Sequence, residues 1–465
     1  MKYKFQSLIL LLVVAISFQS CQDNDDIDFA PDVQINDFIW KGLNIYYLWQ
    51  SDVPDLADNR FANHTQYQDF ISGYTPESLF EALKLDNSID RFSWIVNDYT
   101  VLEQSFQGTT KNNGIEFKLS LDPKNSSNVV GIINYIIPNS DAASKNVKRG
   151  EIFYGVNGIT LTLSNYRTLL FSAAENYILN FADFTANTIV PNGKSIEFTK
   201  TVLNENPILI NKVIPSGGHK IGYLMYNGFY SSYDTILNDA FGVLKTEGVT
   251  DLVLDLRYNP GGSVQSATRL ASMITGQFAG QVFSKLTYNA KKSRNNISYL
   301  FPEKIGSTPI NSLNLTKVYI LTTNSTASAS ELIINGLSPY INVVQIGDVT
   351  VGKNQASVTL YDSSDFSSKN RNPNHKYAMQ PIVALTVNKN GFGDYQSGLA
   401  PTFLQKESVS TYGVLGEPSE PLLNTAISKI TAITTKTLKP AAGEKPLKDL
   451  GDSKSLTGRG GIQIE

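Results

Sequence analysis

The sequence Leu252-Val253-Leu254-Asp255-Leu256-Arg257-Tyr258-Asn259-Pro260-Gly261-Gly262 predicts a buried strand that ends in a tight turn. A short apolar run bounded by a Pro-Gly step is typical of a strand buried on both faces. Two consecutive glycines also let backbone amides come close to a ligand, because no Cβ stands in the way. An oxyanion hole requires this kind of approach. The turn is therefore a candidate for part of an active site.

Strands and helices alternate on both sides of this turn, over residues 206–435. A strand over Ile221–Tyr226 precedes a helical apolar pattern over Tyr233–Thr246. A second strand, Val318–Leu321, precedes a helix over Ser328–Leu337. This alternation predicts a layered α/β core.

The segment Asn324-Ser325-Thr326-Ala327-Ser328-Ala329-Ser330-Glu331 has two interpretations. Ser328 and Glu331 have the spacing of a capping box, which opens a helix. A helix N-terminus also suits a nucleophile, because its free N–H groups and its dipole stabilise developing negative charge. This motif alone does not choose between the two.

Lys353 lies in the turn Val351-Gly352-Lys353-Asn354-Gln355. A lysine in a turn is usually solvated. If it is buried beside Ser328, however, desolvation lowers its pKa and leaves a neutral amine that accepts the hydroxyl proton. His219 and His375 are distant from Ser328 in the sequence and belong to no recognisable motif.

Residues 32–107 have a helical and aromatic pattern, and residues 108–205 have the pattern of short strands. The order of a β-branched run over Val129–Ile137, a capped short helix and the turn Val156-Asn157-Gly158 resembles a PDZ domain. In that family a loop at the position of Gly114, Ile115, Glu116 and Phe117 presents backbone N–H groups to a peptide carboxylate while the peptide adds a strand. Glu116 replaces a glycine of that loop, so we expect weak carboxylate affinity and selection by apolar side chains.

Charge and composition exclude several classes of function. Lys plus Arg is 39 and Asp plus Glu is 42, giving a net charge of −3, which argues against nucleic acid as the main partner. The single cysteine excludes a disulfide framework within one chain, and the three histidines have no metal-binding spacing. We therefore expect neither a metal nor a cofactor.

The N-terminus has the features of a secretory signal. Lys2 and Lys4 precede the apolar run Leu8–Phe18, which is too short to span a bilayer and ends just before Cys21. Residues 1–20 resemble a bacterial lipoprotein signal, with Cys21 as the lipidated residue and 21–31 as a tether. This resemblance implies a lipid anchor in the cell envelope, at the outer membrane on its periplasmic side or at the cell surface. Residues 436–465 are rich in Lys, Gly and Pro and are expected to be loosely ordered.

The motifs of residues 108–430 occur in the order found in peptidase family S41, the carboxyl-terminal processing serine proteases. The resemblance rests on the glycine turn, the Ser328 and Lys353 motifs, Gly398-Leu399-Ala400-Pro401-Thr402 and Leu415-Gly416-Glu417-Pro418. It implies a ClpP/crotonase-like core with Ser328 as nucleophile and Lys353 as general base. It further implies an oxyanion hole formed by Gly261 or Gly262 with the Ala329 amide. The orienting Gln of the family is replaced by Ser357, and either Gln355 or Ser357 could orient the amine.

Three functions therefore remain open. The first is an endopeptidase that forms an acyl-enzyme on Ser328 and acts on periplasmic or surface polypeptides. The second is a catalytically weak or inactive lipoprotein that binds peptides in a chaperone-like manner. The third, suggested by relatives of the family, is the binding of hydrophobic ligands.

Overall fold

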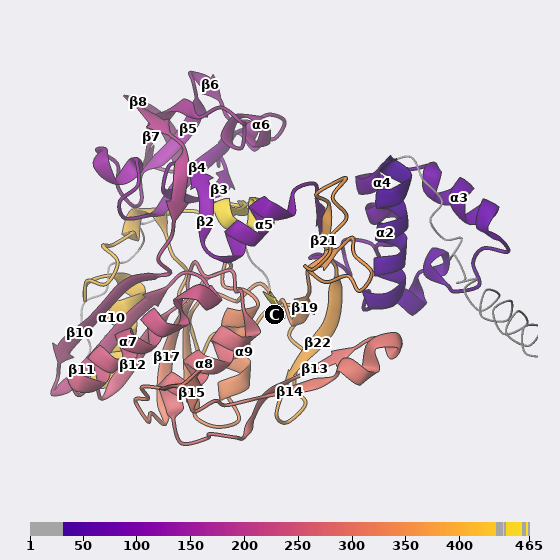
Figure 1. Ribbon diagram of the computed structural model, residues 1–465. Coiled ribbons are helices and arrows are strands. Elements are labelled where there is room, and N and C mark those ends of the chain that lie inside the picture. The colour runs from indigo at the N-terminus through magenta and orange to yellow at the C-terminus, as the bar shows by residue number, and fades with distance from the viewer. Residues whose placement is uncertain (1–30, 434–439, 441–442, 458–461, 464–465) are drawn as a thin grey trace, which may run out of the picture.

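The computed structural model describes residues 31–433, 440, 443–457 and 462–463. The predicted signal, Cys21 and nearly all of the tether lie outside these residues. Figure 1 shows an α/β core with a β-rich region above it and a helical region at its side. Within the described residues, no helix is both long enough and apolar enough to span a membrane.

The N-terminal region is helical, as predicted. Its main helices are α2 (Pro31–Tyr46), α3 (His64–Ser72), α4 (Pro76–Leu83) and α5 (Tyr99–Phe106). Thr75 caps α4 and Pro76 occupies its first turn, because a missing N–H costs nothing at that position. The short strand β1 (Trp94–Val96) pairs with β21 (Ala378–Gln380), which ties this region to the core.

Residues 108–205 form a β-rich unit, called here the β domain. Its sheet has the order β24-β3-β4-β5-β7-β8, in which β24 (Asp449–Asp452) comes from the C-terminal part of the chain, and β2 pairs with β9 in a separate two-stranded sheet. The strands are β2 (Thr109–Asn112), β3 (Ile115–Leu121), β4 (Val129–Ile136), β5 (Ile152–Val156), β7 (Asn176–Thr185), β8 (Thr188–Thr199) and β9 (Thr201–Asn204). Phe117, Phe153 and Phe181 are buried in its core.

The core contains a six-stranded sheet of order β10-β11-β12-β17-β18-β23. Its strands are β10 (Ile208–Ser216), β11 (His219–Tyr226), β12 (Asp251–Asp255), β17 (Lys317–Thr322), β18 (Asn342–Gly347) and β23 (Phe403–Leu404). All neighbours are parallel except β10 and β11. The helices α7 (Asp234–Thr246), α8 (Val264–Thr275) and α9 (Ala329–Leu337) cover one face, and α10 (Pro421–Thr431) covers the other. The predicted α/β layering is confirmed, and β12 alternates accordingly, with Leu252 and Leu254 facing one layer and Val253 the other.

A second sheet lies beside the first in Figure 1 and has the order β14-β13-β22-β19-β25. Its strands are β13 (Val282–Tyr288), β14 (Ile297–Leu300), β19 (Gln355–Ser357), β22 (Ile382–Asn388) and β25 (Ile462–Gln463). Because β19 begins two residues after Lys353, this sheet fixes the position of the lysine turn.

The expectation of a loosely ordered segment after residue 436 is wrong for residues 449–457. Strand β24 (Asp449–Asp452) pairs antiparallel with β3, and helix α11 (Ser453–Leu456) follows it. Leu450 and Leu456 pack on the hydrophobic core of the β domain. Two apolar residues placed against that core therefore order a segment whose composition is otherwise typical of a loop.

Candidate active site

Ser328 occupies a strained position at the start of α9. Its backbone has φ 67° and ψ −115°, which is unusual for a residue with a side chain and recurs at functional sites. Its side chain is fully buried, and within the described part of the chain its hydroxyl has no hydrogen-bond partner. A buried hydroxyl without a partner is uncommon in proteins, which marks Ser328 as a candidate reactive group.

Glu331 connects the nucleophile segment to the lysine turn. Its Oε2 accepts the backbone N–H of Ser328 at 2.7 Å and that of Lys353 at 2.8 Å. Its Oε1 accepts the N–H of Gly352 at 2.6 Å and the hydroxyl of Thr350 at 2.5 Å. The predicted capping-box arrangement of Ser328 and Glu331 is present at the start of α9, and its short contact is the one from the Ser328 N–H to the carboxylate. The capping and nucleophile interpretations are therefore compatible.

Lys353 is buried, with 6% of its surface exposed. Burial lowers the pKa of its amine to about 8, although the carboxylates of Asp90 and Glu331 act in the opposite direction. Its Nζ lies 4.8 Å from the centre of the Phe92 ring. A substantial fraction of the amine is thus neutral near pH 8 and able to accept a proton.

The glycine turn lies directly against Ser328. A Cβ added to Gly261 would lie 2.6 Å from Cβ and 2.8 Å from Oγ of Ser328, and 3.0 Å from the amide nitrogen of Ala329. The N–H of Gly261 already donates to Asn259 Oδ1 at 2.9 Å. Ala329 is the first residue of α9, so its N–H has no acceptor within the helix. Of the predicted oxyanion donors, the amides of Gly262 and Ala329 therefore remain.

Asn259 joins the glycine turn to the segment that carries Ser328. Its carbonyl oxygen accepts the N–H of Ala327 at 3.1 Å and the hydroxyl of Ser330 at 3.0 Å. Its Nδ2 donates to the carbonyl of Tyr226 at 2.8 Å. One side chain and one carbonyl thus fix the glycine turn relative to the segment that carries Ser328.

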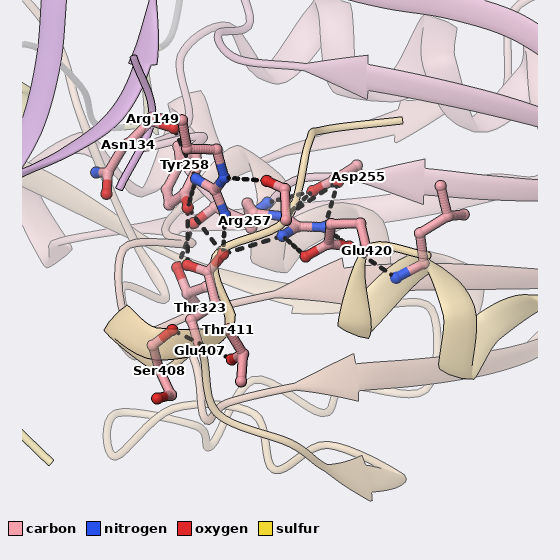
Figure 2. A network of polar contacts seen from close by, with 12 residues as sticks. Asn134, Arg149, Asp255, Arg257, Tyr258, Thr323, Glu407, Ser408, Thr411 and Glu420 are labelled. Carbon is pink, nitrogen blue, oxygen red and sulfur yellow. Dashed lines mark hydrogen bonds and ion pairs between the residues drawn. The ribbon is translucent and has the colours of Figure 1, made fainter. Parts of the chain in front are cut away.

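A buried ionic network supports the other side of the glycine turn (Figure 2). The guanidinium of Arg257, which has no exposed surface, pairs with Asp255, Glu407 and Glu420 at 2.7 to 3.0 Å. Arg149 from the β domain reaches the same Glu407 at 2.6 Å. Burial alone would raise the pKa of Glu407, but the two guanidiniums lower it to about 2.

The N-terminal region supplies residues to the site that the sequence did not indicate. Nη2 of Arg91 donates to the carbonyls of Val351, Gly352 and Gln396 at 3.1 to 3.3 Å. Asp90 is buried and accepts the N–H of Ser93 at 2.9 Å and the hydroxyl of Tyr47 at 2.8 Å. These contacts place a carboxylate and an aromatic ring around the Lys353 amine.

A cavity of about 500 Å³ opens beside Lys353. Its lining includes Phe92, Pro260, Ala327 and Val351 together with Asp449, Gly451 and Asp452 of β24. Its size and its mixture of apolar and polar lining suit a polypeptide segment. No group of three or more His, Cys, Asp or Glu side chains within the described ranges could hold a metal ion.

The remaining predicted residues are buried but have different surroundings. Gln355 and Ser357 lie on β19, and Oε1 of Gln355 has no hydrogen-bond partner within the described residues. The role of either in orienting Lys353 stays a prediction.

In the predicted peptide-binding loop of the β domain, the N–H groups of Gly114 and Ile115 donate to the side chains of Asn112 and Asn113, at 2.6 and 2.9 Å. These amides are therefore already satisfied without a peptide carboxylate.

Two family models match the chain. Residues 220–380 match the peptidase family S41 domain, and residues 34–94 match the peptidase S41 N-terminal domain. The chain carries peptidase family S41 domains. The first match contains Ser328, Lys353 and the glycine turn, and the second contains Asp90 and Arg91.

Several relatives are named for carboxyl-terminal processing. A carboxyl-terminal-processing protease of Picosynechococcus is 27% identical over 34% of this chain and 35% of its own length. The chloroplastic C-terminal processing peptidase of Tetradesmus obliquus is 25% identical over 67% of this chain and 65% of its own length. The chain thus spans about one third to two thirds of these relatives.

Solved structures show the same fold over most of the chain. A candidate S41 protease from Bacteroides fragilis is 27% identical, with a TM-score of 0.67, over 88% of this chain and 99% of its own. A photosystem II D1 C-terminal processing protease is 18% identical with a TM-score of 0.51, over 85% of this chain and 100% of its own. The second likeness concerns the fold alone.

Proposed function

We propose that this protein is a serine endopeptidase of the carboxyl-terminal processing type that uses Ser328 and Lys353. The observation that carries the proposal is the common anchoring of both residues by Glu331, together with the burial that makes the Lys353 amine basic near pH 8. The S41 domains and the names of the relatives support the same reaction class.

Each step of the reaction has a residue available to it. Oγ of Ser328 attacks the carbonyl carbon of the scissile peptide bond while its proton passes to Nζ of Lys353. The amides of Gly262 and Ala329 stabilise the oxyanion. The C–N bond breaks and Lys353 returns the proton to the leaving amine. Water, deprotonated by Lys353, then hydrolyses the ester and restores the Ser328 hydroxyl.

The substrates proposed are polypeptides of the cell envelope. The support for this location is the signal-like N-terminus with Cys21, so a lipid on Cys21 would anchor the enzyme to a membrane. The test is to fractionate cells that express the wild type or Cys21→Ala. If both proteins are found in the membrane fraction, the anchor is not at this cysteine.

A second candidate is peptide binding without hydrolysis. It is favoured by one observation, namely that the Ser328 hydroxyl has no hydrogen-bond partner among the described residues. Catalytic hydrogen bonds are often formed only with substrate bound, so this observation is weaker than the anchoring by Glu331.

Incubation with unfolded, fluorescently labelled casein distinguishes the two. We expect hydrolysis by the wild type and none by Ser328→Ala, with the same melting temperature for both. Binding of casein by the wild type without any cleavage would favour the second candidate.

A further inference from the structure

Residues 449–457 fill the edge of the β domain that an added strand would use. Asp449 lies opposite Ser120 in the register, Gly451 opposite Leu119 and Asp452 opposite Lys118. Addition of an extended segment to an open sheet edge is a common mode of peptide recognition. Here the chain itself supplies that segment.

The segment is held by a site with a definite chemistry. The Ser453 hydroxyl donates to the carboxylate of Glu116 and accepts the N–H of Phe117 at 3.1 Å. Nζ of Lys454 pairs with Oε1 of Glu205 at 3.1 Å and donates to the carbonyl of Asn227 at 2.8 Å. Ser453, Lys454, Glu116 and Glu205 each have no more than 5% of their surface exposed. The site therefore accepts a hydroxyl followed by a cation.

Glu205 makes the requirement for a cation strict. It is buried, and its hydrogen bonds are with Lys454 and with the hydroxyl of Tyr135 at 2.6 Å. Without an arriving cation, the site would contain a buried carboxylate lacking an opposite charge, which is unfavourable. A segment without a basic residue at this position cannot replace Ser453-Lys454.

The same segment runs along the catalytic cavity. Asp449, Gly451, Asp452 and Ser455 line the same cavity as Lys353. Oδ2 of Asp449 accepts Nδ2 of Asn324, four residues before the nucleophile, at 2.7 Å. Farther along, β25 pairs in parallel with Ala356 and Ser357 of β19, directly after the lysine turn. Described residues from this part of the chain therefore lie both at the edge of the β domain and at the strand edge beside the lysine turn.

We propose that residues 449–457 occupy the substrate path as a built-in competitor, and that the Glu116–Glu205 site selects polypeptides with Ser or Thr followed by Lys or Arg. The selected pair can lie within a substrate chain and need not be at its C-terminus, since no free carboxylate takes part in the contacts of Ser453 and Lys454. A substrate that carries this pair gains entry by displacing the segment. The effect on hydrolysis rests on the proposed peptidase function, whereas the binding does not.

A binding experiment tests the site separately from activity. The experiment uses the full chain with Ser328→Ala. In a triple variant, Ser453→Ala and Lys454→Met are added to weaken the contacts of residues 453 and 454 with Glu116 and Glu205. A fluorescein-labelled peptide with the sequence of residues 447–457 is then titrated by anisotropy. We expect the triple variant to bind the labelled peptide at least about tenfold more tightly than the Ser328→Ala single variant does. A control peptide with Ala and Met at the two positions should bind neither.

Equal binding to the two chains, or equal binding of the two peptides, would overturn the proposal and make the segment a fixed structural element.

If the triple variant fails to fold, a disulfide cross-link provides a second test. Ser120→Cys and Asp449→Cys face each other in the register, so their disulfide would lock β24 in place. Labelled peptide should bind the Ser328→Ala chain carrying this pair only after reduction. Binding that is unaffected by reduction, with the cross-link confirmed by thiol titration, would also overturn the proposal.

Activity gives an independent measurement on chains with intact Ser328. For casein hydrolysis, Lys454→Met should lower KM at least about threefold while kcat stays the same, because a competitor is weakened. The unlabelled peptide should inhibit this variant competitively. A KM equal to that of the wild type, with the fold retained, would contradict the competitor role even if the peptide binds.

Discussion

Ser328 and Lys353 donate their backbone N–H groups to the same oxygen atom, Oε2 of Glu331, at 2.7 and 2.8 Å. The proposed nucleophile and the proposed base are therefore fixed relative to each other through the main chain, so the anchoring engages neither of their side chains. The other oxygen of Glu331 holds the lysine turn through Thr350 and Gly352.

This arrangement predicts that Glu331→Gln is damaging despite its equal size. Four donors point at the carboxylate, so the amide NH₂ of glutamine would face N–H or O–H groups and leave them unsatisfied, at a cost of about 1–3 kcal/mol each. We expect a lower melting temperature and a large loss of kcat/KM on casein. The exposed Glu303→Gln is the control and should resemble the wild type. Wild-type stability and activity in Glu331→Gln would contradict the anchoring role.

The second prediction concerns the pH dependence of activity. The base must be unprotonated, and burial lowers the pKa of Lys353 to about 8, so kcat/KM should rise with pH through about 8. Asp90 acts to raise this pKa because its negative charge favours the protonated amine. In Asp90→Asn the midpoint should therefore move to lower pH. A midpoint that moves upward or stays unchanged in the measured pH–rate profile would show that Asp90 does not influence the base.

Gly261→Ala should abolish hydrolysis. The added Cβ would lie 2.8 Å from Oγ of Ser328, and φ of 106° is itself unfavourable for alanine. Gly280→Ala is a matched control, because its φ of 76° is also positive but its Cβ would meet no atom within 4 Å. Both variants carry backbone strain, so a difference between them in casein hydrolysis measures the contact with the nucleophile. Equal activity of the two would place the glycine turn outside the active site.

The network of Figure 2 predicts a stability effect. Arg257→Met would leave the buried carboxylates of Asp255 and Glu420 without their guanidinium partner, while Glu407 would keep Arg149, and breaking such a buried pair costs about 3–5 kcal/mol. Denaturant unfolding should show this loss, whereas exposed Arg294→Met should change the unfolding free energy little. A loss in Arg257→Met no larger than in the control would mean that the three carboxylates are accommodated in another way.

The sequence predicted the parts of the fold that depend on local pattern. The apolar run before the glycine turn became β12, and the segment after Ser328 became α9, because periodicity determines which face of each element is buried. Ser328 and Lys353 were predicted to act together from the order of their motifs; the structure joins their backbone N–H groups at one oxygen of Glu331, and their catalytic roles stay a prediction. Glu331 was noticed only as a helix cap, since its bond to the Lys353 amide joins residues whose proximity depends on tertiary structure.

Other features could not be predicted from local pattern. Asp90 and Arg91 reach the lysine turn from a separate region of the chain, and no local signal indicates such a contact. The composition around Leu450 and Leu456 is that of a loop, yet the open edge of β3 orders it. In both cases the partner surface, and not the segment itself, determines the structure.

The most direct test of the account is labelling of Ser328 by a fluorophosphonate, followed by mass spectrometry of the intact protein and its peptides. This reagent forms a covalent bond with an activated serine and needs no knowledge of the substrate. We expect one label per wild-type chain, on Ser328, at a rate that rises with pH through about 8, and a rate at least about tenfold lower in Lys353→Met. Labelling of Lys353→Met at the wild-type rate, or no labelling of Ser328 in the wild type, would contradict the claim that Lys353 activates Ser328.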